Sequence, residues 1–78
     1  MPEITIYTRT TCAPCRAVKH WLKSKGFVYT EKNVDEDPSH IDMVLKQTGM
    51  QMVPVTIVNG ETVLGLNLSR LSQLLVDN

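Results

Sequence analysis

The sequence lacks both an excess of charge and any long apolar run. Eight lysines and arginines balance eight aspartates and glutamates among 78 residues, so the formal net charge is zero. Such a chain has no overall field that would favour nucleic acid or an anionic membrane surface, and we expect neither as a partner. No segment approaches the ~20 apolar residues that span a bilayer. Residues 1–8 resemble no signal sequence, so we expect a cytoplasmic protein.

Glycine and proline are also scarce, at four residues each. With 42% hydrophobic residues, the composition is that of a folded globular domain and not of a disordered chain. A chain of 78 residues is too short to divide its core between two domains. We therefore expect a single domain over residues 1–78, with a monomer as the simplest state.

The order of apolar segments and turn residues predicts an α/β fold. Short runs rich in β-branched and aromatic residues predict strands at 3–8, 27–34, 55–58 and 62–64. Apolar residues at helical spacing predict helices at 13–25, 38–48 and 68–75. Since a helix joins the first two strands, we expect these strands to be parallel. The predicted architecture is a mixed four-stranded sheet flanked by three helices, in the order βαβα-ββα.

Turn and cap residues sharpen this prediction at the C-terminal end of the chain. Asn59-Gly60 separates the last two strands, and both residues tolerate the positive φ of a type I′ turn. The sequence therefore predicts an antiparallel hairpin. The last helix is opened by Asn67 or by Ser69 as N-cap.

Local signals also predict how the second helix begins and packs. Asp37 is the expected N-cap and Pro38 the first helical residue. The acidic residues 35–37 would favour the positive end of the helix dipole, and Gly49 is expected to end the helix. Four residues at helical spacing mark the expected inner face: Ile41, Val44, Leu45 and Thr48.

The two cysteines, Cys12 and Cys15, lie three positions apart. Closing so short a ring restricts the unfolded chain by only about 2 kcal/mol, before any strain is subtracted. Chemistry explains the pair better than stability does, and we interpret it as redox-active. The pair comes where the first strand ends and the first helix begins. Because a helix N-terminus stabilises a thiolate, we expect a reactive thiol there at neutral pH.

The helical pattern assigns the two cysteines different roles. Cys12 comes first in the turn, so we expect it to be the more exposed and to attack a substrate disulfide. Cys15 falls on the inward stripe with Val18 and Leu22, and is expected to resolve the mixed disulfide. Pro14 fits the first helical turn, where a missing N–H costs no hydrogen bond. The cycle ends in a Cys12–Cys15 disulfide that an external reductant must reduce, and we expect no bound cofactor.

With Cys12-Ala13-Pro14-Cys15 after a strand, Val53-Pro54 before a hairpin and Gly65-Leu66-Asn67 before the last helix, the sequence resembles the glutaredoxin family over essentially its whole length. It is most similar to the small glutaredoxin-like and NrdH-redoxin branch. The resemblance implies a minimal thioredoxin fold, a cis peptide bond at Val53-Pro54 and thiol–disulfide oxidoreductase activity. Arg9 takes the place of a basic residue that in glutaredoxins helps hold a carboxylate of glutathione.

Two departures from the glutaredoxin pattern favour a different reductant. Pro14 stands where glutaredoxins usually have an aromatic residue, which is more similar to thioredoxin's Cys-Gly-Pro-Cys. In segment 64–68, Gly65 alone is left of the residues that cradle the γ-glutamyl end of glutathione. We therefore expect recycling by thioredoxin reductase, as in NrdH-redoxins, with disulfide-containing proteins as substrates and ribonucleotide reductase as one client. The alternative is a glutathione-dependent glutaredoxin.

The resemblance also outlines the substrate site and an alternative of another class. We expect the substrate to contact residues around the cysteines, the Val-Pro loop and the last turn: Arg9, Thr11, Ala13, Pro14, Val53, Pro54, Gly65 and Asn67. Some glutaredoxins hold an iron–sulfur cluster between two monomers, so cluster binding is that alternative. We expect no metal site within the chain, because His20 is offset on the helix from both cysteines. His20 and His40 are expected to be solvated.

Three basic residues near the motif have two interpretations. Arg9, Arg16 and Lys19 could form a basic rim that lowers the pKa of Cys12 and attracts acidic partner surfaces. They could equally be an ordinary solvated surface of the first helix and its lead-in. The sequence favours neither interpretation over the other.

Overall fold

Seven elements follow one another in the order that the sequence predicts. The computed structural model describes residues 2–76. Its elements are β1 (Ile4–Thr8), α1 (Ala13–Ser24), β2 (Thr30–Asn33), α2 (Ser39–Thr48), β3 (Val55–Val58), β4 (Glu61–Leu64) and α3 (Leu68–Leu75). Among these described residues, none of the helices has the length and hydrophobicity needed to cross a membrane.

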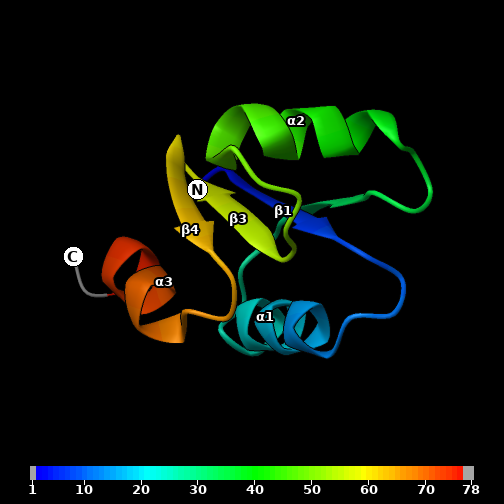
Figure 1. The fold of residues 1–78 in the computed structure, drawn as a ribbon. Helices are drawn as coiled ribbons and strands as arrows, with labels where there is room; N and C mark the ends of the chain where they lie inside the picture. The colour runs from blue at the N-terminus through cyan, green and yellow to red at the C-terminus, as the bar shows by residue number, and fades with distance from the viewer. Residues whose placement is uncertain (1, 77–78) are drawn as a thin grey trace.

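The four strands form one mixed sheet in the order β2-β1-β3-β4. β1 pairs with β2 in parallel, with Ile6 opposite Glu31. β3 is antiparallel to both β1 and β4. Helix α2 covers one face of the sheet, whereas α1 and α3 cover the other (Figure 1). This arrangement confirms the predicted architecture, the minimal thioredoxin fold.

Apolar side chains fill both faces of the sheet. Because side chains alternate along a strand, Ile4 and Ile6 of β1 face α1 and α3, whereas Tyr7 faces α2. The buried core on the α1/α3 face comprises Ile4, Ile6, Val18, Leu22, Val58, Val63 and Leu71. The buried core on the α2 face comprises Tyr7, Val34, Val44 and Val55. The sheet thus separates two cores of different size.

The predicted turns and caps are confirmed where they depend on special backbone conformations. Asn59 has φ 49° and Gly60 has φ 89°, the two positive values that a type I′ hairpin turn requires. Gly49 ends α2 with φ 78°, in the left-handed conformation. Of the two residues proposed to cap α3, it is Asn67 that does so, because its side chain accepts a hydrogen bond from the Arg70 N–H at 3.1 Å.

The predicted boundaries lie within one residue of the observed ones, except at the start of β2. β2 begins at Thr30 and not at residue 27, because Phe27 ends the turn after α1: its N–H bonds to the Leu22 carbonyl at 3.0 Å and its ring stacks on Trp21. α2 begins at Ser39, with Pro38 in the cap position. Asp37 nevertheless supplies the hydrogen bond predicted for the N-cap, since its carboxylate accepts from the Ser39 N–H at 3.1 Å.

The predicted inner face of α2 is wrong at one position. Val44 is 2% exposed, and Ile41 and Thr48, which flank it one turn away, are partly buried. Leu45 is 37% exposed. Successive helical residues are rotated by about 100° around the helix axis. When Val44 points at the sheet, Leu45 therefore points sideways from α2. The buried stripe of α2 is therefore narrower than the apolar pattern indicates.

Candidate redox site

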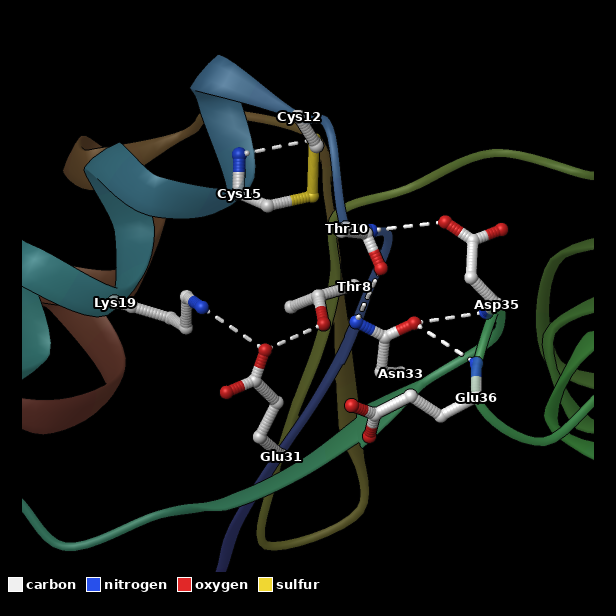
Figure 2. A network of polar contacts seen from close by, with 9 residues as sticks. All are labelled: Thr8, Thr10, Cys12, Cys15, Lys19, Glu31, Asn33, Asp35 and Glu36. Carbon is white, nitrogen blue, oxygen red and sulfur yellow. Dashed lines mark hydrogen bonds and ion pairs between the residues drawn. A yellow bond between two sulfur atoms is a disulfide. The ribbon is translucent and has the colours of Figure 1, made fainter.

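The cysteine pair lies at the N-terminus of α1, as the sequence predicts. Cys12 is the N-cap residue, and its Sγ accepts a hydrogen bond from the Cys15 N–H at 3.2 Å. The two sulfurs form a disulfide between Cα atoms 5.2 Å apart (Figure 2). Cys12 is partly exposed, whereas Cys15 is 1% exposed. The difference in exposure expected for an attacking and a resolving thiol is present.

Local sequence explains why α1 begins at this point. Ala13 is the first helical residue and Pro14 follows within the first turn, where its missing N–H leaves no hydrogen bond unmade. The first helical bond runs from the Arg16 N–H to the Cys12 carbonyl at 3.2 Å. Cys15 and Val18 are then buried towards the sheet. The start of the helix thus fixes one sulfur in the core and leaves the other at the surface.

The loop that precedes Cys12 is held by the segment that follows β2. The Thr10 N–H donates to Oδ2 of Asp35 at 2.9 Å, and Arg9 Nε lies 3.6 Å from Oδ1 of the same carboxylate. Asn33 Oδ1 accepts the N–H of Asp35 at 2.8 Å and the N–H of Glu36 at 3.2 Å (Figure 2). The sequence predicted only that Asp35 lies in the acidic turn before α2, where the structure places it. The contact by which Asp35 ties two loops together was not predicted.

A second polar contact lies beside the cysteines on the α1/α3 face. Thr8 is fully buried, and its hydroxyl donates to Oε2 of Glu31 at 2.6 Å. Lys19 Nζ donates to the same oxygen at 2.9 Å (Figure 2). The hydrogen bond from Thr8 lowers the pKa of Glu31 below its usual value; partial burial opposes this shift, and Lys19 reinforces it. Glu31 is therefore a stabilised carboxylate that links β1, β2 and α1.

These contacts bear on the two interpretations of the basic residues. Arg9 is paired with Asp35 and Lys19 with Glu31. Arg16 is exposed, and among residues 2–76 no carboxylate lies within ion-pair distance of it. Two of the three charges are thus compensated locally. The structure favours ion-paired surface residues over a basic rim that acts on Cys12.

The Val-Pro loop approaches the last turn, as the resemblance implies. The Val53-Pro54 peptide bond is cis. The Gly65 N–H donates to the Pro54 carbonyl at 2.8 Å. A Cβ on Gly65 would make only an ordinary van der Waals contact, 3.9 Å from the Met52 Cε, but φ at Gly65 is 67°, so the backbone conformation favours glycine. Within the described residues, neither backbone polar group of Val53 has a hydrogen-bond partner.

A cavity of about 270 Å³ lies between these loops and α2. It is lined by Arg9, Val34, Ile41, Val44, Gln51, Met52 and Val53. The sequence predicted two of these as substrate contacts, Arg9 and Val53. Val34 and Gln51 were not expected there, because four separate segments meet at the cavity and no local sequence pattern predicts that they do.

Of the remaining predicted site residues, Thr11, Ala13 and Pro14 flank the cysteines in the chain, and Asn67 precedes α3. Thr11 and Ala13 are exposed on either side of Cys12. The Asn67 side chain is used to cap α3. His20 is exposed, as expected, but His40 is not simply solvated: its ring packs edge-on against Tyr7 at 6.2 Å, and its side chain is 24% exposed.

Comparison with known proteins identifies the family. The glutaredoxin family model matches residues 4–63. The chain belongs to the glutaredoxin family. The glutaredoxin-like protein NrdH of Lactococcus lactis subsp. cremoris is 30% identical over 71 residues, which cover 91% of this chain and 97% of the relative.

Solved structures agree with this membership. The glutaredoxin-like NrdH-redoxin from Escherichia coli, described as having a thioredoxin-like activity profile, is 32% identical with a TM-score of 0.80, over 92% of this chain and 93% of that one. The thioredoxin-like protein BC3987 is 33% identical with a TM-score of 0.87, and the match covers 94% of this chain and 100% of that one. Glutaredoxin-family proteins are thiol–disulfide oxidoreductases, and this chain is such an enzyme, with its cysteine pair at the start of α1.

Proposed function

We propose that this glutaredoxin-family enzyme reduces protein disulfides, with Cys12 as nucleophile and Cys15 as resolving thiol, and that thioredoxin reductase recycles it. One observation carries the proposal: the partly exposed Cys12 sulfur caps α1 and accepts the Cys15 N–H at 3.2 Å, while Cys15 is buried behind it. A backbone N–H at a helix N-terminus stabilises negative charge on the sulfur that faces a client.

The first step is an exchange at Cys12. Its thiolate attacks one sulfur of the client disulfide, a bond forms between the two sulfurs, and the second client sulfur leaves as a thiolate that takes up a proton. The backbone of Val53, which has no hydrogen-bond partner among residues 2–76, supports this step, because an extended client segment could hydrogen-bond to it. The product is a mixed disulfide between the client and Cys12.

The second step uses Cys15. Its thiolate attacks the Cys12 sulfur, the mixed disulfide breaks, and the second client thiolate is released and protonated. Two electrons have then passed from the enzyme to the client, and the Cys12–Cys15 disulfide remains. The Cα atoms of the two residues lie 5.2 Å apart in the oxidised enzyme, within the usual range for a disulfide.

The proposed reductant follows from residues of this chain and from its relatives. Pro14 stands between the cysteines as it does in thioredoxin, and Gly65 alone is left of the glycine-rich cradle for glutathione. The relatives include NrdH proteins, one of which is described as having a thioredoxin-like activity profile. NADPH would supply two electrons through thioredoxin reductase to the disulfide. Ribonucleotide reductase is the client that the resemblance implies.

A specific observation keeps glutathione as the second candidate reductant. The cavity beside the Val-Pro loop carries the guanidinium of Arg9 and the amide of Gln51 on otherwise apolar walls. A cation and an amide donor can hold a carboxylate. In that case glutathione would resolve the mixed disulfide at Cys12, and glutathione reductase with NADPH would regenerate it.

The test supplies one reductant at a time. NADPH consumption is followed with a small disulfide substrate, either with thioredoxin reductase alone or with glutathione and glutathione reductase, and Cys12→Ser is the blank. We expect turnover with thioredoxin reductase. Turnover with glutathione alone would instead make the chain a glutathione-dependent glutaredoxin. No turnover in either assay, from folded protein with two free thiols, would refute the proposed recycling and favour another low-molecular-weight thiol as reductant, or iron–sulfur cluster binding.

A further inference from the structure

An ion pair lies at the rim of the cavity beside the Val-Pro loop. Arg9 is the one cationic residue among those that line the cavity. Its Nε lies 3.6 Å from Oδ1 of Asp35, and the two side chains are 50% and 44% exposed. Two further hydrogen bonds hold Asp35 in place. Its other carboxylate oxygen accepts the Thr10 N–H at 2.9 Å, and its backbone N–H donates to the Asn33 side chain. The carboxylate is therefore fixed beside the guanidinium.

We propose that Asp35 is a specificity-determining residue, which neutralises Arg9 and so selects uncharged, apolar client segments over disulfides of carboxylate-bearing small thiols such as glutathione. This inference rests on the proposed function and names the substrate class at the same site. A ligand carboxylate at the cavity would have to share the guanidinium with Asp35 and would lie beside a like charge. An uncharged segment meets neither obstacle.

The walls of the cavity agree with such a client. Five of its seven lining residues are apolar, and they come from the end of β2, from α2 and from the Val-Pro loop: Val34, Ile41, Val44, Met52 and Val53. With about 270 Å³, the cavity lies at or just below the small end of the range for ligand pockets, about 300–1,000 Å³. It suits a side chain next to a client cysteine better than a whole large ligand.

The neighbouring carboxylate provides a matched control. Glu36 is exposed, and within residues 2–76 its side chain makes no hydrogen bond or ion pair. Figure 2 shows the Asp35 carboxylate directed at Thr10 and the Glu36 carboxylate pointing away from it. Glu36→Gln thus removes the same charge from the next residue without releasing Arg9. Asp35→Asn removes the charge but keeps an oxygen that can accept the Thr10 N–H.

The experiment compares two disulfides with enzyme that has been reduced in advance, so that no reductase is needed. The rate of enzyme oxidation is measured with glutathione disulfide, which carries carboxylates, and with bis(2-hydroxyethyl) disulfide, which carries none. We expect Asp35→Asn to raise the ratio of the first rate to the second about two- to five-fold, the effect of an exposed ion pair. Glu36→Gln should leave the ratio close to that of the wild type.

A double substitution tests whether the effect passes through Arg9. In an Arg9→Gln background, Asp35→Asn should raise the ratio by a smaller factor than in the wild-type background, because only the like-charge effect of Asp35 is left. An equal rise in Glu36→Gln would overturn the proposal, because it would reflect general charge. A rise of the same size with and without Arg9 would also overturn it, because the effect would then not pass through the guanidinium. An unchanged ratio in Asp35→Asn, with both rates lowered alike, would mean that Asp35 acts only by holding Thr10, and would overturn it too.

A binding measurement separates this inference from the proposed function. S-Methylglutathione has carboxylates but no thiol to exchange, and its dissociation constant for the oxidised enzyme is measured by NMR titration. We expect Asp35→Asn, but not Glu36→Gln, to lower that constant about two- to five-fold. If no disulfide oxidises the wild-type enzyme, the proposed function fails while the titration still decides the role of Asp35. Equal constants in wild type and Asp35→Asn would refute that role.

Discussion

The two faces of the sheet are packed to different degrees. The α1/α3 face holds seven buried core residues and the α2 face holds four. α1 alone buries Cys15, Val18 and Leu22, whereas α2 buries only Val44. The cavity beside the Val-Pro loop opens on the α2 face. The enzyme thus has a densely packed face and a sparsely packed face on one small sheet.

This difference matches the two tasks of the site. A resolving thiol must stay at a fixed distance from its partner, and dense packing around α1 keeps Cys15 in place. Client recognition instead needs space that different side chains can enter, and the α2 face provides it. The comparison therefore predicts that changes on the first face affect chemistry and stability most.

The largest effect is expected at the cysteines. Cys12→Ser should reduce turnover to the level measured without enzyme, because a serine hydroxyl forms no disulfide. Cys15→Ser should still attack a protein disulfide but accumulate the mixed disulfide, which mass spectrometry detects as an adduct that dithiothreitol removes. An adduct in Cys12→Ser, with none in Cys15→Ser, would reverse the assigned roles. That result would also contradict the inference that dense packing around α1 holds the resolving thiol.

Matched leucine substitutions compare the two faces directly. Leu22 of α1 is fully buried, whereas Leu45 of α2 is 37% exposed. Leu22→Ala should lower the free energy of unfolding by about 2–5 kcal/mol, through lost burial and the cavity left behind. Leu45→Ala should change it by less than about 1 kcal/mol. Denaturant unfolding of the oxidised proteins measures both values, and equal losses would contradict the comparison.

Sequence patterns predicted the densely packed face better than the other. The stripe of Cys15, Val18 and Leu22 is buried as predicted, and Asn59-Gly60 forms the predicted turn. Each of these features depends on residues close together in the chain. The stripe of α2 was predicted too wide at Leu45, because an apolar residue does not reveal how broad a surface its helix meets.

The polar part of the candidate site was the least predictable. The cysteines carry a strong local motif, but Asp35 contacts Thr10 across 25 positions and Glu31 contacts Thr8 across 23. Both contacts follow from the parallel pairing of β1 with β2, which sets the register between distant segments. The sequence indicates that β1 and β2 are parallel, but it does not indicate their register. The partners of Asp35 and Glu31 could therefore not be assigned from the sequence.

Helix caps provide a test, with a smaller expected effect, of the comparison between the two faces of the sheet. α1 and α3, on the densely packed face, begin with side chains that accept N–H groups, Cys12 and Asn67. Asn67→Ala should lower the free energy of unfolding by about 1 kcal/mol, the usual cost of a lost N-cap. Ser69→Ala, two residues further on, is the control, with an expected change within about 0.5 kcal/mol. A larger loss in Ser69→Ala would mean that the cap is misassigned.

The smallest effect is expected at Glu31, on the polar border of the α1/α3 face. Because the pKa of Glu31 is lowered in the folded state, chiefly by the Thr8 hydroxyl, its stabilising effect is fully present above the unfolded-state pKa and is lost as pH falls through the folded-state pKa. About a third of the side chain is exposed, so solvent screening keeps the effect below about 1 kcal/mol. Glu31→Gln should be less stable than wild type at pH 7.

The measurement is the free energy of unfolding of wild type and Glu31→Gln between pH 7 and pH 3. We expect the difference between them to shrink as the pH falls below about 4.5, where the wild-type carboxylate takes up a proton. In a Thr8→Val background the difference should be smaller at every pH, because the main donor to the carboxylate is gone. A difference that stayed constant from pH 7 to pH 3 would show that packing, and not the charge of Glu31, links β2 to the densely packed face.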